Sequence, residues 1–249
     1  MTEVQTDSLA STRRWAIGLS LAAAAGVLAT LWMVFFYVPT ESTMGVVQRI
    51  FYVHVPSAWN AFLAFVIVAL CSLGYLWLHD DRLDAIAVSA AEIGVIFTTI
   101  VLTTGPLWAS IAWGAWWVWD PRLTLTLLLW FIYVGYFMLR GATENPERGK
   151  RFAAVLGIVG AIDIPLIHLS VLWFRSQHPK PVILKPEGPT ADPRIVQTLL
   201  LGFLSFTLLF FALLLLRYGV ERMRRSVEAL RYRQAMDSPV THDSQGVYR

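Results

Sequence analysis

The sequence predicts an all-α, polytopic membrane protein with six transmembrane helices. Of the 249 residues, 56% are hydrophobic and 15% are charged, whereas a soluble domain carries about 25% charged residues. The charged residues are also segregated, so that long stretches of the chain contain almost none. The composition therefore excludes a soluble globular domain. The single cysteine, Cys71, can form no internal disulfide and does not identify the compartment.

Six apolar stretches are long enough to cross a bilayer, which takes about 20 mostly apolar residues. They cover residues 15–38, 56–78, 85–108, 123–139, 152–173 and 195–216. The N-terminal polar stretch leads into the first span without a cleavage-site pattern, so we expect an uncleaved first helix. The last span is the most uniformly apolar, and we expect it at the lipid-facing periphery.

Turn residues support these boundaries. The pairs Asp120-Pro121 and Asp192-Pro193 each have the pattern of a helix N-cap followed by proline at the first helical position. Pro56 is placed to open the second helix in the same way. Asn145-Pro146 interrupts the chain before the fifth helix.

The distribution of lysine and arginine predicts that both termini are cytoplasmic. With six spans, one side carries fourteen of these residues: Arg13, Arg14, Arg82, Arg140, Arg148, Lys150, Arg151, Arg217, Arg222, Arg224, Arg225, Arg231, Arg233 and Arg249. The other side carries six: Arg49, Arg122, Arg175, Lys180, Lys185 and Arg194. The net charge of +3 and pI of about 9.2 reflect this asymmetry and do not indicate a nucleic-acid partner.

The chain therefore divides into a cytoplasmic N-tail (1–14), a membrane domain (15–217) and a basic C-tail (218–249), with a short helix expected over 221–233. The loops after the first, third and fifth spans share one face, whatever the orientation. These loops are residues 39–55, 108–122 and 174–194, and charge counting assigns them to the periplasmic side.

The second of these loops has an unusual density of tryptophan. Residues 113–124 read W-G-A-W-W-V-W-D-P-R-L-T, with Trp113, Trp116, Trp117 and Trp119 inside seven residues and Trp108 just upstream. A single interfacial tryptophan usually belongs to the aromatic belt of a membrane protein. Four in one short loop would crowd a single spot instead of ringing the protein. The cluster therefore favours a platform for a flat, apolar ligand.

Two histidines lie on the same face as this platform. His54 ends the first outer loop and His178 lies in the third. Each alone is most simply a loop histidine bonded to its surroundings. Together they can supply one axial ligand to each side of a haem iron, whereas two histidines are too few for a closed zinc site. His168, near the outer end of the fifth span, is the rival ligand, although its simplest role is a bond within the bundle.

The remaining candidates are charged. Asp120 is first an N-cap of the fourth helix, and it also counts among the candidate haem-binding residues. Arg122 can pair with it or hold a carboxylate such as a propionate. Glu92 and Asp163 lie inside spans, where an acid is functional by default or bonds to another helix. The sequence does not identify the partner of either acid.

The Trp-rich segment resembles the WWD signature of haem-handling membrane proteins, and the length and six spans resemble the CcmC family of cytochrome c maturation. The segment F-Y-V-H-V-P-S-A-W is similar to that family's first-loop ligand segment, which implies that His54 is a haem ligand. S-V-L-W-F-R-S-Q-H-P is similar to its third-loop segment, which implies the second ligand at His178. The resemblance covers residues 15–217.

The resemblance also implies a function. Members of this family hold haem b at the periplasmic face of the inner membrane and load it onto the haem chaperone CcmE. They work with the ABC transporter subunits CcmA and CcmB and the small membrane protein CcmD, and they are carriers, not enzymes. Two alternatives stay open on the sequence: a permease that uses Glu92 and Asp163 to move haem or another solute, and a structural subunit whose Trp-rich loop packs on a partner.

Overall fold

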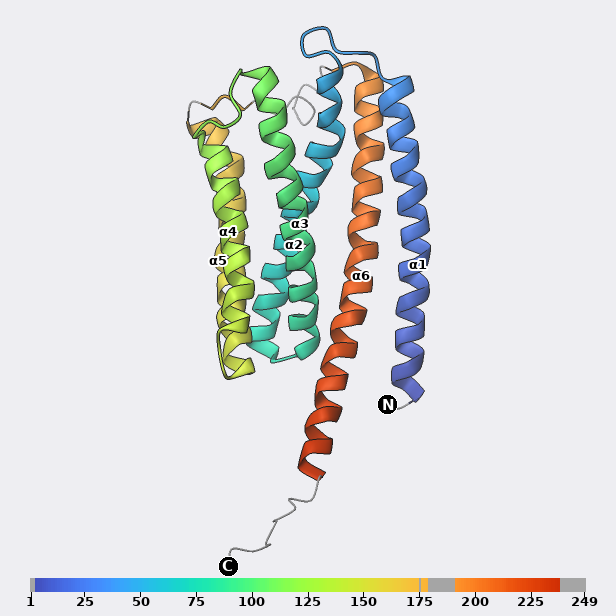
Figure 1. Ribbon diagram of the computed structural model, residues 1–249, viewed down its shortest axis with the longest axis vertical. Coiled ribbons are helices and arrows are strands. Elements are labelled where there is room, and N and C mark those ends of the chain that lie inside the picture. Colours follow the sequence, from blue (N-terminus) through green and yellow to red (C-terminus); the bar gives the residue numbers. More distant parts are fainter. Residues whose placement is uncertain (1–2, 175, 179–190, 238–249) are drawn as a thin grey trace, which may run out of the picture.

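Six long helices account for most of the part of the chain that the computed structural model describes, which is residues 3–174, 176–178 and 191–237 (Figure 1). They are α1 (Glu3–Trp32), α2 (Phe51–Leu78), α3 (Asp81–Ala112), α4 (Pro121–Gly141), α5 (Pro146–Trp173) and α6 (Pro193–Asp237). A π-helical turn, η1 (Met33–Tyr37), extends α1, and a 3₁₀ turn, η2 (Val46–Ile50), precedes α2. Each of the six is long and apolar enough to cross a membrane, which confirms the predicted all-α class and number of spans.

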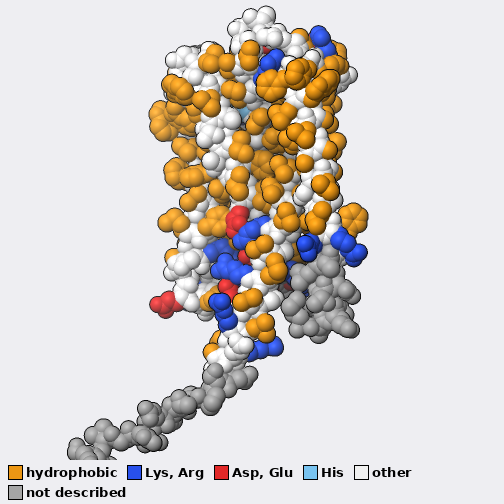
Figure 2. All heavy atoms as spheres, turned by 45° about the vertical axis from the view of Figure 1, so that its right-hand side comes forward, with side chains coloured by type: hydrophobic (Ala, Val, Ile, Leu, Met, Phe, Trp, Pro, Cys, Tyr) orange, Lys and Arg blue, Asp and Glu red, His pale blue; other side chains and the backbone are white. Residues whose placement is uncertain are grey.

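The connections α1–α2 and α3–α4, the end of α5 and the start of α6 lie at one end of the bundle, called here the loop end (Figure 1). The start of α1 and the end of α6 lie at the opposite, terminal end (Figure 1). The two ends are separated by a band of mainly hydrophobic side chains, with charged side chains gathered toward the terminal end (Figure 2). The predicted cytoplasmic location of both termini stays a prediction, but the start of α1 and the end of α6 lie on one side, as six spans require.

The predicted N-cap of α4 is confirmed, and Asn145, which was predicted only to interrupt the chain, caps α5. The Asp120 carboxylate accepts a hydrogen bond from the backbone N–H of Arg122 at 2.9 Å, and Pro121 opens α4. The Asn145 side chain accepts from the backbone N–H groups of Glu147 and Arg148, with Pro146 at the first helical position of α5. Each cap satisfies N–H groups that have no partner inside the helix.

The predicted start of the second helix is wrong. Pro56 lies inside α2, which begins at Phe51 and is preceded by η2. Residues 46–55 are mostly apolar and contain no helix breaker, so helical structure continues upstream of the proline. His54 therefore lies in the first turn of a helix and not in a loop, as the division of the chain had placed it.

The expected position of the sixth helix is also wrong. α6 lies between α1 and the rest of the bundle, and α1 is the outlying helix (Figure 1). The backbones of α1 and α6 lie close together at Gly26, where a Cβ would come within 2.6 Å of Ser205 Oγ. Small residues that let backbones approach are typical of helix contacts in membranes. α6 also continues through the expected short helix over 221–233 without a break.

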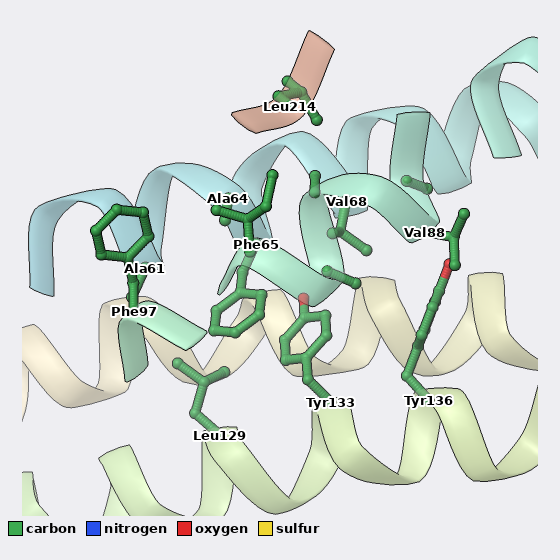
Figure 3. Packing of buried hydrophobic residues seen from close by; sticks show 14 of the residues in the cluster. Ala61, Ala64, Phe65, Val68, Val88, Phe97, Leu129, Tyr133, Tyr136 and Leu214 are labelled. Carbon is green, nitrogen blue, oxygen red and sulfur yellow. The ribbon is translucent and has the colours of Figure 1, made fainter. Parts of the chain in front are cut away.

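The main hydrophobic core lies between α2, α3, α4 and α5, and α6 contributes Phe210 and Leu214 to it (Figure 3). The rings of Phe65 and Tyr133 are stacked with their centroids 3.7 Å apart. The Tyr133 hydroxyl donates to the carbonyl of Gly157 at 2.9 Å, so its polar end is satisfied inside the bundle. This core fixes α2, α3 and α4 relative to one another, and these helices carry most of the candidate site.

Ionic contacts tie the helices together at the terminal end. The Arg140 guanidinium donates two hydrogen bonds to the buried Asp84 carboxylate, at 2.6 and 2.8 Å, and Arg225 donates a third at 2.8 Å. Arg217 pairs with Glu92. These contacts join α3, α4 and α6, and they give Glu92 the partner that the sequence could not identify.

Candidate functional site

A cavity of about 410 Å³ opens between α2, α3 and α4 toward the loop end. Its volume falls within the range of about 300–1,000 Å³ that small-molecule sites occupy. The deeper wall is apolar, and the polar lining residues stand mostly near the loops. The lining residues used below are Met44, His54, Gly105, Trp108, Trp113, Trp117, Arg122, Gln177 and His178.

The structure places both predicted iron ligands on the wall of this one cavity. His54 reaches it from the first turn of α2, and His178 from the segment after α5. The two imidazoles are near enough to interact electrostatically. They thus come from separate elements to one chamber at the loop end.

The tryptophans divide into two groups. Trp108, in α3, and Trp113 and Trp117, in the loop between α3 and α4 (the Trp loop, residues 113–120), line the cavity. Trp116 and Trp119 do not line it and are 64% and 75% exposed. Of the four tryptophans predicted to form a platform, two therefore line the cavity, together with Trp108.

Two hydrogen-bond donors on residues that line this cavity have no acceptor among the described residues. The Trp117 Nε1 atom is buried and has no hydrogen-bond partner among the described residues. The Arg122 guanidinium lines the cavity, and within the described ranges it makes no hydrogen bond or close ion pair. Buried donors normally have partners, so these two groups are suited to an acidic group on a ligand.

The contrast between two identical tripeptides explains why Arg122 is available. Asp120-Pro121-Arg122 and Asp192-Pro193-Arg194 both begin helices. In the second, the Arg194 guanidinium folds back onto the Asp192 carboxylate at 3.0 Å, and this bond lowers the pKa of Asp192. In the first, Asp120 is 6% exposed, and its carboxylate is occupied by backbone N–H groups.

Asp120 itself does not line the cavity but joins two loops. One carboxylate oxygen caps α4, and the other accepts a hydrogen bond from the backbone N–H of Gln177 at 2.8 Å. Gln177 immediately precedes His178. The residue predicted as an N-cap and as a possible ligand contact therefore anchors the segment that carries the second histidine.

Met44 is a site residue that was not predicted from the sequence. Trp108 Nε1 lies 3.1 Å from Met44 Sδ, and Met44 is held by a turn in which the Glu41 carboxylate accepts from the backbone N–H of Thr43 and of Met44. The bond to Met44 is the main cause that lowers the pKa of Glu41. The position of Met44 in an outer loop was the only signal in the sequence.

The other histidines lie elsewhere. His168 is exposed on α5 and lies against the ring of Phe62, with centroids 5.2 Å apart, and it does not line the cavity. His79 ends α2 at the terminal end, in a left-handed conformation. His242, like the cations Arg175, Lys180 and Lys185, lies outside the described residues. The structure therefore brings together His54 and His178 and leaves His168 apart.

The two acids inside the spans are also separate from this cavity. Glu92 pairs with Arg217, and Asp163 is buried in α5, where neither carboxylate oxygen has a hydrogen-bond partner among the described residues. Neither acid lines the cavity at the loop end. The described residues also contain no cluster of three or more histidine, cysteine, aspartate or glutamate side chains that could hold a metal ion alone.

The chemistry of the cavity fits a metalloporphyrin. Its apolar wall and indole rings suit the flat ring, two imidazoles suit the iron, and the Arg122 guanidinium and Trp117 N–H suit the propionates. A bare metal ion would leave the apolar wall and both of these donors without a ligand. The residues present therefore fit haem better than a mononuclear metal site.

Comparison with known proteins agrees with this reading. The family model described as "CcmC: Heme exporter protein C" matches residues 4–233. The chain is 38% identical to heme exporter protein C of Bradyrhizobium diazoefficiens over 197 residues, which cover 79% of this chain and 75% of the relative. It is 37% identical to that of Rhodobacter capsulatus over 206 residues, 81% of this chain and 84% of the relative.

The protein of the same name from Escherichia coli K12 is 34% identical over 216 residues, covering 86% of this chain and 84% of the relative. The family model thus extends over most of the membrane domain and includes the cavity and all three loops around it. The chain belongs to the heme exporter protein C (CcmC) family, the non-enzymatic, multi-pass bacterial membrane proteins that handle haem in cytochrome c maturation.

Proposed function

We propose that this protein binds haem b in the cavity at the loop end and delivers it to the periplasmic haem chaperone CcmE. The observation that carries the proposal is the convergence of His54 and His178 on one apolar cavity lined by Trp108, Trp113 and Trp117. Each imidazole would supply one axial ligand to the iron. Membership of the CcmC family supports haem as the cargo.

The remaining residues bear on how the porphyrin ring would be oriented in the cavity. Arg122, at the start of α4, and the Trp117 N–H would bind propionates, because both lack a protein acceptor in the described part of the chain. Trp116 and Trp119 are exposed on the same loop and would meet either the chaperone or the lipid headgroups.

The two ligands differ in how they are held. His54 belongs to α2 and packs on α3, whereas His178 lies outside any helix and is positioned through the bond from Gln177 to Asp120. Release of haem requires at least one Fe–His bond to break, and the ligand outside the helices is the more readily displaced. We assign that step to His178.

Within the cell, the loop end would face the periplasm, in line with the fourteen basic residues assigned to the opposite side. The protein would work as the haem-handling subunit beside CcmA, CcmB and CcmD. The basic groups at the terminal end, on α4 and α6, then face the cytoplasm, where transporter subunits and anionic lipid are available as partners.

Absorption spectra of the purified protein test the ligand assignment. We expect a low-spin haem spectrum for the wild type, and a high-spin or absent spectrum for His54→Ala and for His178→Ala. His168→Ala is the matched control, since His168 is close in sequence to His178 but does not line the cavity. Wild-type spectra in both ligand variants, or a change in His168→Ala alone, would overturn the assignment.

A further inference from the structure

His54 makes one hydrogen bond that the haem site described above does not use. Its Nδ1 atom lies 2.9 Å from the hydroxyl oxygen of Thr104 on α3. The same hydroxyl lies 2.6 Å from the backbone carbonyl oxygen of Ile100, one turn earlier in α3. Thr104 thus connects the imidazole of α2 to the backbone of the neighbouring helix.

The direction of both bonds follows from the donors available. A threonine hydroxyl has one hydrogen, and a carbonyl oxygen can only accept. At 2.6 Å the hydroxyl hydrogen must therefore lie between Thr104 and Ile100. The Thr104 oxygen is left to accept from His54, so Nδ1 carries the imidazole proton and donates it to this bond.

This assignment determines the other nitrogen of the ring. A neutral imidazole has one N–H and one lone pair, so with Nδ1 protonated the lone pair is on Nε2. Nε2 makes no hydrogen bond to any described residue, and His54 lines the cavity. The protein therefore presents a metal-ligating nitrogen before any ligand has entered.

We propose that Thr104 is a positioning residue that sets the tautomer and ring orientation of His54 for haem ligation, an inference that rests on the proposed function. Its role matches that of the partners which bind the second nitrogen of metal-ligating histidines, and whose loss typically costs about 10- to 100-fold in metal affinity. Such a bond also makes the ligating nitrogen more basic, which favours the oxidised iron.

Two other residues of α3 contact the imidazole of His54 and help to hold it in place. The ring of Trp108 meets it edge-on, with centroids 6.0 Å apart at 74°. A Cβ on Gly105 would lie 3.3 Å from His54 Cε1, so the absence of a side chain there allows the ring to approach α3. Thr104, Gly105 and Trp108 therefore fix the ring by a hydrogen bond, a close contact and an aromatic contact.

The first experiment uses the haem-free protein. NMR of protein labelled with ¹⁵N-histidine distinguishes protonated from unprotonated ring nitrogens, and among the five histidines the His54 signals are those that disappear in His54→Ala. We expect the Nδ1–H tautomer in the wild type and a mixture of tautomers in Thr104→Val. An Nε2–H tautomer in the wild type would overturn the inference whether or not haem binds.

The second experiment measures haem affinity and reduction potential. Thr104→Val keeps the side-chain shape but removes the acceptor, so we expect haem affinity to fall about 10- to 100-fold and the potential to rise. Thr104→Ser should restore both. The matched control is Thr103→Val, since the Thr103 hydroxyl makes the same bonds to the backbone of α3 (Thr99 and Ile100) but is exposed and does not meet a histidine.

The outcomes separate this inference from the proposed function. If His54→Ala alters the haem spectrum but Thr104→Val changes neither affinity nor potential, the role of Thr104 is wrong and the ligand assignment stands. Equal losses in Thr104→Ser and Thr104→Val would show a packing effect and would also overturn it. If His54→Ala leaves the spectrum unaltered, the proposed ligation fails, and the tautomer measurement still decides whether Thr104 directs the imidazole.

Discussion

The carboxylate of Asp120 accepts a hydrogen bond from the backbone N–H of Gln177 at 2.8 Å, and this single contact joins the Trp loop to the segment carrying His178. The second oxygen of the same carboxylate caps α4. One buried acid therefore sets the start of a helix and the position of a candidate iron ligand. The Arg122 side chain, next but one along the chain, is left available to a ligand.

Replacing Asp120 by asparagine should weaken haem binding without unfolding α4. Asparagine caps helices as well as aspartate does, but it has one acceptor oxygen and would present an NH₂ group to one of the two N–H donors. The loss of a hydrogen bond to a charged group corresponds to about 1.5–3 kcal/mol. We expect haem affinity to fall by at least about tenfold, with loss of low-spin character, in a titration followed by absorption.

The chain supplies a matched control for this change. Asp192-Pro193-Arg194 repeats the tripeptide at the start of α6, where the Asp192 side chain likewise caps the helix but makes no contact with the cavity. Asp192→Asn should leave haem affinity as in the wild type. Equal effects of the two substitutions would show that the Gln177 contact does not position His178.

The two groups of tryptophans should respond differently to substitution. Trp117→Phe keeps an aromatic ring but removes the buried Nε1 donor, which has no partner among the described residues. Haem affinity should therefore fall about tenfold or more if a bond to a charged propionate is lost. Trp116→Phe and Trp119→Phe, at exposed positions, should leave affinity in detergent unchanged. Their effect is expected in the rate of haem transfer to the chaperone. A larger loss of affinity in Trp116→Phe than in Trp117→Phe would contradict the assigned arrangement.

Gly105→Ala should disturb the His54 ring while preserving the helix. The added Cβ would lie 3.3 Å from His54 Cε1, and the imidazole must shift by a few tenths of an ångström. Alanine favours helix over glycine by about 1 kcal/mol, so stability should not fall. The expected result is reduced haem affinity with an unchanged or raised melting temperature.

Gly135→Ala is the comparison for this variant. A Cβ at Gly135 of α4 meets only Leu156 Cδ2, at the ordinary contact distance of 3.7 Å. The same gain in helix propensity should appear there without a change in haem binding. If both glycine variants bind haem as the wild type does, the close packing of His54 on α3 is not needed for ligation.

The sequence was sufficient for features that depend on local chemistry. The spans follow from long apolar runs, the cap at Asp120 follows from the Asp-Pro pair, and the break before α5 follows from the Asn-Pro pair. The start of α2 was misplaced because proline at the first turn and proline further inside a helix leave the same local pattern. The position of α6 beside α1 depends on small residues such as Gly26, which allow the two helices to approach. A single sequence does not show which helix such a glycine will contact.

The site was predictable in its residue types but not in its geometry. The Trp loop has no helical or strand periodicity that would indicate which tryptophans face the cavity. Their directions depend on the path of the backbone, in which Gly114 has a φ of 70°. The bonds of His54 to Thr104 and of Asp120 to Gln177 join residues more than 45 positions apart. Such contacts are fixed by the packing of helices, and no local pattern in a single sequence reports them.

Removing Asp84 should destabilise the bundle without altering the haem site. Its carboxylate is buried at the terminal end between Arg140 and Arg225, and Asp84→Ala would leave both guanidinium groups without their acceptor. Breaking a buried ion pair in this way costs about 3–5 kcal/mol. We expect a lower melting temperature in detergent, measured on the haem-free protein, while the haem spectrum of the folded fraction stays as in the wild type.

The control for Asp84 is Glu228→Ala, which removes an exposed ion pair with Arg224 in α6. Exposed pairs contribute little, because water screens the charges and the side chains lose conformational freedom. Asp84→Ala should therefore melt well below Glu228→Ala. If the two variants melt together, the charged cluster does not hold α3, α4 and α6, and the stability of the terminal end must come from the apolar contacts of the core alone.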